Sequence, residues 1–350
     1  MTRIERVSLT ERRAAVSHAN AAHVWKLREG IVVSLHAGAI TGSGEASPLP
    51  GYSRDDLPTC RRELEDAARR LEGMDVPADA REALREATRR AGVRAPAAVF
   101  AVETAVLDLL GHALAKPAWA LLRGDGRASP IALSALAEGA TADELARSAE
   151  AAVARGIATV KIKIGGAGKA AEDCDRLAAV RARVGDRVGL RLDANQTLSR
   201  EEIVARIGGL AAFGPELVEE PTATDAWLTL PPLPVPVAMD ESLAEDGWTE
   251  RIVTCAARQT CAAIVLKPTS LGGVLRCLAI ADVAERAGMS MIVTHTFDGP
   301  IASAAAACLA LALRGRVLPC GLDSRHRLER PIAPVTDTHV VPFDAPGIGA

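Results

Sequence analysis

The sequence feature that most constrains the fold is an alternation after Gly124, in which short apolar runs are separated by helical stretches rich in Ala, Arg and Glu. A run recurs roughly every 20–30 residues, which is the spacing of consecutive strand–helix units, and eight such units close into a β/α barrel. A doubly wound open sheet is the alternative, and it is disfavoured because no G-x-G-x-x-G motif follows any run. The runs span residues 129–137, 159–165, 189–195, 216–221, 236–242, 262–268, 291–297 and 316–323.

The N-terminal third contains both strand-like and helix-like segments. Residues 31–38 (IVVSLHAG) alternate in the manner of a strand, whereas residues 42–53 (GSGEASPLPGYS) are rich in Gly, Pro and Ser, which predicts a loop. Two helical stretches follow, at 57–73 and 96–124. The second is apolar on all sides, so we expect it to be largely buried.

Composition disfavours several classes of function. The net charge of −3 is spread over interspersed acids and bases, which gives no long-range attraction to nucleic acid or to an anionic membrane. Aromatic residues make up only 3% of the chain, too few to favour base-stacking platforms. The seven cysteines are scattered without a C-x-x-C motif, which favours reduced thiols over a disulfide framework or a zinc site.

The sequence also carries no sign of export or membrane insertion. The N-terminal residues lack the apolar core of a signal peptide, and the most apolar later run, at 301–313, is too short to span a membrane. We therefore expect a soluble cytoplasmic protein that acts on a small molecule. The sequence leaves open whether it forms a homo-oligomer.

Charged residues stand at the ends of six consecutive runs. Lys161 and Lys163 lie on the same face of the second run, because side chains alternate along a strand. Lysine is rarely buried without a partner, since taking an ammonium out of water is costly. In a barrel the carboxyl ends of all strands surround one cavity, so polar groups from other runs are expected to meet the lysines there. These groups are Asp193, Asn195, Glu219, Glu220, Asp240, Glu241, Lys267 and His295.

Three of these acids, Asp193, Glu219 and Asp240, predict a metal site. Three carboxylates on adjacent strands would form a negative cluster unless a cation lay between them. Oxygen ligands alone, one from each strand, suit a hard divalent ion such as Mg2+, with Mn2+ as the alternative. Glu220 and Glu241 are predicted to orient a ligand or a catalytic lysine, and a purely structural role is the alternative.

The flanking lysines predict proton transfer. A nearby metal ion and a second ammonium both lower the pKa of a lysine, which makes a neutral amine available as a base near neutral pH. The predicted chemistry is removal of a proton next to a carboxylate, with the resulting enediolate held on the metal. The competing interpretations are a solvated edge strand for the lysines and helix caps or turns for the acids.

Five ordered motifs, KIKIG, RLDAN, VEEP, MDES and VLKPTSLGG, resemble the signature of the muconate-lactonizing-enzyme-like subgroup of the enolase superfamily. The segment AVETAVLDLLGHALAKPAWALLRG resembles the helix that precedes the barrel in that subgroup. The resemblance extends over nearly the whole chain. It implies an α/β fold with a modified (β/α)7β TIM-type barrel at 126–324. An α+β capping domain would be formed by residues 1–125 and completed by the C-terminal tail, 325–350.

The same resemblance implies roles for individual residues. The three acids named above would bind Mg2+, and Lys163 and Lys267 would lie on opposite faces of the substrate. Lys161 would sit behind Lys163, lower its pKa and contact the substrate carboxylate. The expected substrate contacts are Pro50, Gly51, Tyr52, Ser53, Asn195, His295, Gly321 and Leu322.

Within the subgroup, the loop GEASPLPGYS and the segment LPCGLDSRHRL are similar to those of o-succinylbenzoate synthases of the menaquinone pathway. The reaction implied is dehydration of 2-succinyl-6-hydroxy-2,4-cyclohexadiene-1-carboxylate. Lys163 would remove the proton alpha to the ring carboxylate and return it to the departing hydroxide. Lys267 would stabilise the anionic intermediate.

Two further features bear on which reaction the chain catalyses, and the first departs from the synthase pattern. The seventh run reads THTFDGP where such synthases often carry small Ser-rich sequence, so His295 and Asp298 are expected to contact substrate or to form another acid/base pair. Dipeptide epimerases carry Asp-x-Asp on the last strand, whereas here only Asp323 is present, which argues against a dipeptide epimerase. A racemase or epimerase of N-acylamino acids or dipeptides, and a cycloisomerase, are the alternatives. A barrel that only binds a small carboxylate is the non-enzymatic one.

Overall fold

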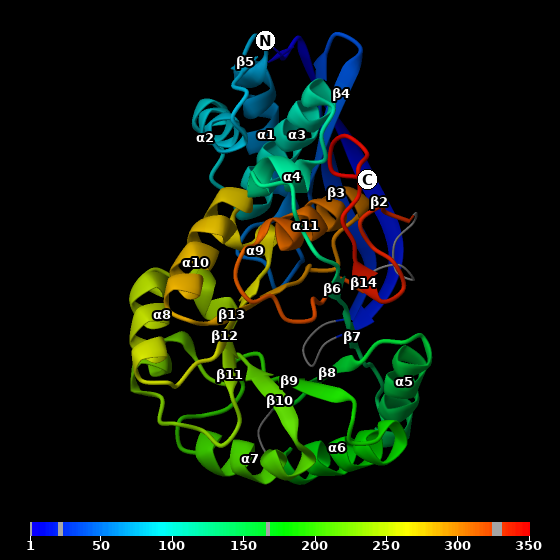
Figure 1. Cartoon of the computed structure of the whole chain (residues 1–350), viewed down its shortest axis with the longest axis vertical. Coiled ribbons are helices and arrows are strands. Elements are labelled where there is room, and N and C mark those ends of the chain that lie inside the picture. Colours follow the sequence, from blue (N-terminus) through cyan, green and yellow to red (C-terminus); the bar gives the residue numbers. More distant parts are fainter. Residues whose placement is uncertain (1, 20–23, 166–168, 324–330) are drawn as a thin grey trace.

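The computed structural model describes residues 2–19, 24–165, 169–323 and 331–350. Its centre is a curled sheet of seven parallel strands in the order β13-β12-β11-β10-β9-β8-β7 (Figure 1). Each strand pairs with the next along the chain, as strand–helix repeats require, and this confirms the predicted barrel architecture. The strands are β7 (Ser134–Leu136), β8 (Thr159–Lys163), β9 (Gly189–Asp193), β10 (Pro215–Glu219), β11 (Val237–Met239), β12 (Ala263–Leu266) and β13 (Ser290–Val293).

The eighth predicted strand, at 316–323, does not form a regular strand. Val317 and Gly321 each make a single bridge to β13 or the residue after it, and Cys320 bridges to the residue before β7 and accepts a hydrogen bond from Ser134 at 2.8 Å. The segment therefore closes the ring between the last and the first strand. Pro319 lies within it and has no backbone N–H, so a continuous ladder is interrupted there.

Helices cover the outside of the barrel, as Figure 1 shows for α5, α6, α7, α8 and α10. The barrel interior is filled at one level by a small apolar cluster of Leu217, Ala238, Ala263, Val265 and Ile292. The helices of this part are α5 (Ala142–Ala154), α6 (Ala170–Val184), α7 (Ile203–Leu210), α8 (Trp248–Ala257), α9 (Pro268–Leu271), α10 (Val274–Arg286) and α11 (Pro300–Ala312). Short 3-10 turns lie at η1 (Ala211–Phe213), η2 (Thr224–Thr229) and η3 (Glu241–Ala244).

The N-terminal part is an antiparallel sheet packed on helices. Its strands are β2 (Arg6–Ala19), β3 (Val24–Ala37) and β4 (Ile40–Ala46), with β1 (Thr2–Arg3) pairing separately with β5 (Asp75–Val76). Its helices are α1 (Leu57–Leu71), α2 (Ala80–Ala91), α3 (Pro96–Leu114) and α4 (Ala118–Arg123). The predicted strand at 31–38 falls almost entirely within β3, which ends at Ala37.

The predicted loop at 42–53 is wrong over its first five residues, which belong to β4. Gly42 and Gly44 are there because β4 packs directly on the backbone of α3. A Cβ at Gly44 would overlap the carbonyl oxygen of Ala101, and one at Gly42 would overlap that of Ala105. Glycine in a strand therefore marks a close approach of two backbones here, not a turn.

The stretch predicted as one helix at 96–124 is divided in two. Ala115 adopts a left-handed conformation with φ of 51°, and Pro117 then prevents the helix from continuing. The expected burial is confirmed, because α3 is buried along most of its length. It is the one described helix long and apolar enough to cross a membrane, and 78% of its apolar window is buried within the fold.

The described part of the C-terminal tail lies against the N-terminal helices. Strand β14 (His339–Val340) pairs with β6 (Ile131–Ala132), and the backbone N–H of Ile348 donates to Asp108 at 2.9 Å. The indole of Trp119 donates to the carbonyl of Phe343 at 2.9 Å. Residues 325–330 of the predicted tail lie outside the described residues, and the domain boundaries stay a prediction.

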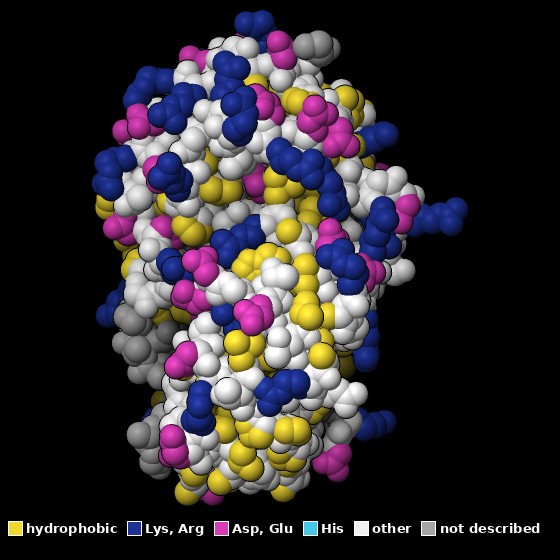
Figure 2. Space-filling view, turned by 90° about the vertical axis from the view of Figure 1, so that its left-hand side faces the viewer, with side chains coloured by type: hydrophobic (Ala, Val, Ile, Leu, Met, Phe, Trp, Pro, Cys, Tyr) yellow, Lys and Arg dark blue, Asp and Glu magenta, His cyan; other side chains and the backbone are white. Residues whose placement is uncertain are grey.

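The surface and the cysteines complete the description. Figure 2 shows Lys and Arg interspersed with Asp and Glu over one face of the molecule. None of the seven cysteines, all of which lie in described segments, forms a disulfide, and six of them are buried.

Candidate active site

One pocket at the carboxyl ends of the barrel strands brings together nine of the residues predicted from the sequence. They face it because inward and outward side chains alternate along each strand. On β8, for example, Val160 and Ile162 are completely buried on the outer side, whereas Lys161 and Lys163 line the pocket. The nine are Tyr52, Lys161, Lys163, Asp193, Asn195, Glu219, Lys267, His295 and Gly321.

Lys161 joins two of the carboxylates. Its Nζ lies 2.9 Å from Asp193 Oδ2 and 2.8 Å from Glu219 Oε2. Burial alone would lower the pKa of Lys161, but the two carboxylates outweigh this and raise it. Burial likewise favours the neutral form of Asp193, yet Lys161 and the other lysines hold its pKa below the usual value. The two carboxylates therefore favour the charged form of Lys161.

The pKa of Lys163, two residues along the same strand, is shifted in the opposite direction. Burial lowers its pKa, Asp193 opposes this, and the positive charges of Lys161 and Lys267 lower it further. The neutral amine of Lys163 is thus easier to obtain than that of an ordinary lysine. The pKa values of the two lysines of one strand are therefore shifted in opposite directions.

Lys267 stands at the end of β12 and is held by groups from two parts of the chain. Its Nζ donates to the carboxylate of Asp240 and to the hydroxyl of Tyr52, and it lies 4.9 Å from the centre of the tyrosine ring. The hydroxyl of Tyr52 in turn donates to Glu241 Oε1 at 3.1 Å. Burial would lower the pKa of Lys267, but Asp240 and Glu241 raise it, so Lys267 remains charged.

Glu220 and Asn195 shape the site from outside its centre. Glu220 is buried and accepts hydrogen bonds from the backbone N–H of Asp240 at 2.6 Å and from the indole of Trp227 at 3.2 Å. Asn195, with φ of 41°, donates from its amide to Glu241 Oε1 at 3.0 Å. Together these contacts fix the ends of β9, β10 and β11 relative to one another.

Several predicted substrate contacts lie outside the pocket. Pro50 presents its carbonyl to the indole of Trp25 at 2.9 Å, and Ser53 Oγ accepts from the backbone of Leu49 at 2.8 Å. Gly51 is exposed, and Leu322 is buried in the apolar core. These residues shape the loop and the last barrel segment and do not line the pocket, so their role as substrate contacts stays a prediction.

The sequence interpretation missed ten residues of the pocket wall. Strand alternation relates five of them, because Val265 precedes Lys267 by two positions, as Ser134 does Leu136 and Ile292 does Thr294. Trp25 and Leu49 carry no local signal, since the fold alone brings the N-terminal segments to the barrel. The ten are Trp25, Leu49, Ser134, Leu136, Val265, Ile292, Thr294, Thr296, Phe297 and Asp323.

The acid cluster fits a hard divalent cation by its donor chemistry. The three predicted ligands supply carboxylate oxygens only, and Glu241 Oε2 beside them is buried without a hydrogen-bond partner among the described residues. Within those residues no cluster of three or more His, Cys, Asp or Glu side chains already surrounds one point. The lysine ammonium groups neutralise the carboxylates in the arrangement seen here.

Comparison with known proteins identifies the family to which a chain with this site belongs. Residues 144–350 match the family described as Enolase C-terminal domain-like. A chloromuconate cycloisomerase from Pseudomonas putida is 32% identical over 284 residues, which cover 79% of this chain and 75% of the relative. An o-succinylbenzoate synthase from Desulfotalea psychrophila is 30% identical over 313 residues, covering 81% and 83%. An L-Ala-D/L-Glu epimerase from Clostridium acetobutylicum is 29% identical, covering 71% and 70%.

Solved structures share the fold over the whole length. The muconate lactonizing enzyme from Pseudomonas fluorescens, complexed with muconolactone, superposes with a TM-score of 0.87 at 24% identity, covering 99% of this chain and 96% of the other. A dipeptide epimerase from Enterococcus faecalis V583, complexed with Mg and the dipeptide L-Leu-L-Tyr, gives a TM-score of 0.86 at 23% identity, covering 100% and 99%. The chain therefore belongs to the enolase superfamily, in its muconate-lactonizing-enzyme-like subgroup.

Proposed function

We propose that this enzyme is a Mg2+-dependent o-succinylbenzoate synthase that dehydrates 2-succinyl-6-hydroxy-2,4-cyclohexadiene-1-carboxylate. The observation that carries the proposal is the pairing of a lysine of lowered pKa, Lys163, with a charged lysine, Lys267, in one pocket. A base and a fixed positive charge are what removal of a proton next to a carboxylate requires. The synthase relative also matches the largest share of both chains among the three relatives described above.

The lysines have different roles in the proposed reaction. The neutral amine of Lys163 removes the proton on the carbon alpha to the ring carboxylate, and the electron pair of that C–H bond moves onto the carboxylate. Lys161 and Lys267, both held as ammonium ions, stabilise the negative charge that develops. The C–O bond to the ring hydroxyl then breaks, and the Lys163 ammonium returns its proton to the leaving hydroxide. The products are water and an aromatic ring.

Asp193, Glu219 and Asp240 would hold the divalent cation, for which Mg2+ is proposed and Mn2+ is the alternative. When bound, such an ion supplies fixed positive charge next to the substrate carboxylate. Glu220 keeps the ends of the strands that carry these acids in register. Glu241, through Tyr52 and Asn195, links this acid cluster to the rest of the pocket.

The lining of the pocket suits a ring and an acyl chain better than an amino group. Trp25, Leu49, Val265, Ile292 and Phe297 give it apolar surface. The one carboxylate on the last barrel segment, Asp323, is engaged by Arg155, whose Nη2 lies 2.5 Å from Asp323 Oδ2. A substrate ammonium would have to compete with this guanidinium.

A second candidate is a racemase or epimerase, because two lysines in one pocket provide a base for each face of a substrate carbon. In that reaction Lys267 would also have to give up its proton, which the raised pKa of Lys267 disfavours in the arrangement seen here. A cycloisomerase is the remaining alternative within the subgroup, and the chloromuconate cycloisomerase relative favours testing it.

The test is a direct assay of the purified protein with Mg2+ and the cyclohexadiene carboxylate, in which the aromatic product is followed by its absorbance. We expect turnover by the wild type and a loss of about 10²- to 10⁴-fold in Lys163→Ala, the usual contribution of a general base. Absence of turnover by the wild type would overturn the synthase proposal. The same preparation is then given dipeptides and N-acylamino acids in deuterated water, where exchange at the alpha carbon would identify an epimerase, and muconates, where lactone formation would identify a cycloisomerase.

A further inference from the structure

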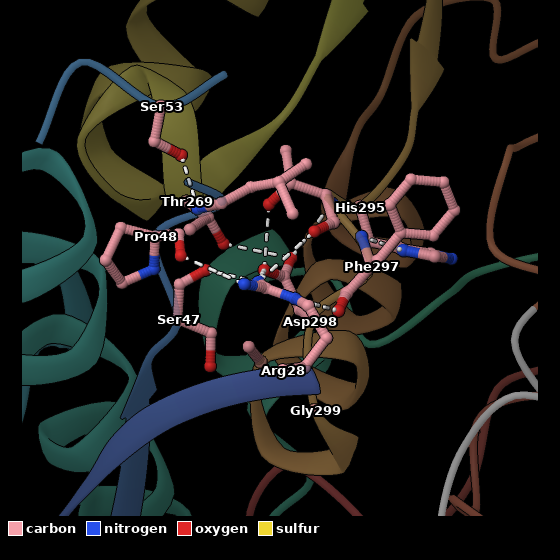
Figure 3. A network of polar contacts seen from close by, with 12 residues as sticks. Arg28, Ser47, Pro48, Ser53, Thr269, His295, Phe297, Asp298 and Gly299 are labelled. Atoms are coloured by element: carbon pink, nitrogen blue, oxygen red, sulfur yellow. Dashed lines mark hydrogen bonds and ion pairs between the residues drawn. The ribbon is translucent and has the colours of Figure 1, made fainter. Parts of the chain in front are cut away.

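Arg28, on β3 of the N-terminal sheet, is a buried arginine that does not line the pocket. It forms hydrogen bonds to two loops that contribute residues to the pocket wall. Its side chain is 1% exposed. It donates to the carbonyls of Ser47 at 2.6 Å and Pro48 at 2.9 Å, which lie just after β4. It also donates to the carbonyls of Phe297 at 3.0 Å and Thr296 at 3.3 Å, which lie after β13. One guanidinium thus joins two loops that are far apart in the sequence (Figure 3).

The charge of Arg28 is compensated inside the same network. Asp298 Oδ1 lies 3.9 Å from Arg28 Nη2, and both side chains are 1% exposed. Asp298 is itself fixed, because it accepts from the hydroxyls of Thr296 at 2.8 Å and Thr269 at 3.0 Å. Asp298, which the sequence suggested as a substrate contact or acid/base group, is therefore occupied with positioning the loop after β13.

Both loops carry residues of the pocket wall. Leu49 and Tyr52 follow the carbonyls of the first loop, and His295 and Phe297 belong to the second. Phe297 has φ of 54°, a conformation that non-glycine residues adopt only when the surroundings hold them there. In this conformation its backbone N–H donates to His295 Nδ1 at 2.9 Å. Because Nδ1 accepts, the proton of a neutral ring lies on Nε2.

We propose that Arg28 is a positioning residue, a buried guanidinium that fixes the loops at 47–53 and 294–299 to each other and so sets the substrate end of the pocket and the tautomer of His295. The effect on the substrate rests on the proposed function, whereas the effect on the loops does not. Lysine cannot replace Arg28, since one ammonium cannot direct donors to four carbonyls from a planar fork. The pocket wall is thereby coupled to a residue that never touches the substrate.

The test compares Arg28→Met and Arg28→Lys with the wild type by amide hydrogen exchange. We expect peptides covering residues 47–53 and 294–299 to exchange about tenfold faster or more in both variants, since each buried carbonyl loses a charged donor. Peptides from β8 to β10 are expected to be unchanged. Arg181→Met is the matched control, because Arg181 also donates to backbone carbonyls, those of Gly185, Val188 and Phe213, but far from these loops.

Kinetics give a second, separate readout. With a substrate that the wild type turns over, Arg28→Lys is expected to raise KM about tenfold while kcat changes little, and Arg181→Met is expected to change neither. Free guanidinium added to Arg28→Ala should restore part of the affinity. If no substrate is found, the proposed function fails while the exchange experiment still decides the role of Arg28.

Unchanged exchange in both loops of a folded Arg28→Met would overturn the inference, as would faster exchange spread evenly over the molecule. If Arg28→Met does not fold, Asp298→Asn is measured in its place. That variant keeps the shape of the side chain and removes the charge beside Arg28, so the same two loops are expected to exchange faster. Equal exchange in Asp298→Asn and the wild type would then overturn the proposal.

Discussion

Tyr52 is the residue at which the N-terminal part of the chain enters the chemistry of the barrel. Its hydroxyl accepts from Lys267 and donates to Glu241, so it links a cation and an anion that belong to the barrel. Burial and the negative charges of Asp240 and Glu241 raise the pKa of Tyr52 well above its ordinary value. Tyr52 is also the only tyrosine in the sequence, which makes it directly observable.

The ultraviolet titration of the folded protein is therefore expected to report on Tyr52 alone. The tyrosinate band should appear only above the ordinary midpoint of about pH 10, and unfolding in denaturant should return the midpoint to that value. Above pH 10 the unfolded chain loses its tyrosine proton first, so the free energy of unfolding falls as the pH rises further. A midpoint of about 10 or below in the folded protein would contradict the burial of this hydroxyl.

Removal of the Tyr52 hydroxyl should affect catalysis more than stability. Tyr52→Phe keeps the ring beside Lys267 but leaves Lys267 and Glu241 without their common partner. Hydrogen bonds to charged groups contribute about 1.5–3 kcal/mol, so kcat/KM is expected to fall by about 10- to 100-fold. Urea unfolding of the same variant provides the control. A kcat/KM equal to that of the wild type would show that the hydroxyl does not position Lys267.

Among the structural elements, β4 and α3 show how tightly the N-terminal part is packed. Gly42 and Gly44 bring the strand against the helix backbone, and the sequence alone predicted a loop at this place. Glycines in turns and glycines at close approaches look alike in one sequence. Only the position of the neighbouring helix separates the two cases.

Substitution of Gly44 tests this packing. Gly44→Ala places a methyl group against the carbonyl of Ala101 in α3, and overpacking of this kind costs about 1–3 kcal/mol. Gly209→Ala is the control, because a Cβ at Gly209 in α7 would meet nothing within 4 Å. The substitution also replaces a glycine inside a helix. Thermal unfolding should show a lower Tm for the first variant and an equal or higher Tm for the second. Equal Tm values for Gly44→Ala and the wild type would contradict the close approach.

The start of α10 depends on a carboxylate supplied by α3. Glu103 Oε2 accepts from the backbone N–H of Leu275 at 3.0 Å, in the first turn of α10. Burial raises the pKa of Glu103 to about 7. Between the unfolded value of 4.5 and about 7, the folded protein keeps a proton that the unfolded chain has lost. The free energy of unfolding therefore decreases as the pH rises through this window.

Glu103→Gln is expected to remove this dependence. The loss of unfolding free energy between about pH 4.5 and pH 7 should shrink by up to roughly 3 kcal/mol, as measured by urea unfolding at several pH values. Glu86→Gln, on the exposed face of α2, should leave the dependence in this window unchanged because the pKa of Glu86 is lowered. A slope that is the same in Glu103→Gln and the wild type would show that Glu103 titrates normally.

At the scale of the whole molecule, the proposed divalent site should act on folding as well as on activity. A cation that binds only the folded chain adds about 2.7 kcal/mol of stability at about 100 times its Kd. We expect Mg2+ to raise the Tm in a saturable manner, EDTA to reverse the rise, and Glu219→Gln to weaken it. A Tm that does not respond to Mg2+ or Mn2+ would argue against the site.

The parts of this molecule that the sequence predicted share one property, which is that their signal is local. Lys161, Asp193, Glu219 and Lys267 each end an apolar run, so strand order alone predicts that they meet at one end of a barrel. Arg28 has no such signal, because its four carbonyl partners belong to two loops, one of them almost 270 positions away in the sequence. The irregular eighth barrel segment was also missed, although Pro319 within the run is itself a signal against a continuous strand.

The division of the pocket between the two ends of the chain has a consequence for how such an enzyme changes. The charged groups proposed for the chemistry lie between residues 161 and 267, whereas Trp25, Arg28, Leu49 and Tyr52 lie between residues 25 and 52. Recombination that exchanges this early stretch between relatives but keeps Tyr52, which holds Lys267, is therefore expected to alter which molecules are accepted while leaving the proton-transfer groups in place. A laboratory library confined to these few dozen codons, with the codon of Tyr52 held constant, explores substrate preference without changing the catalytic groups.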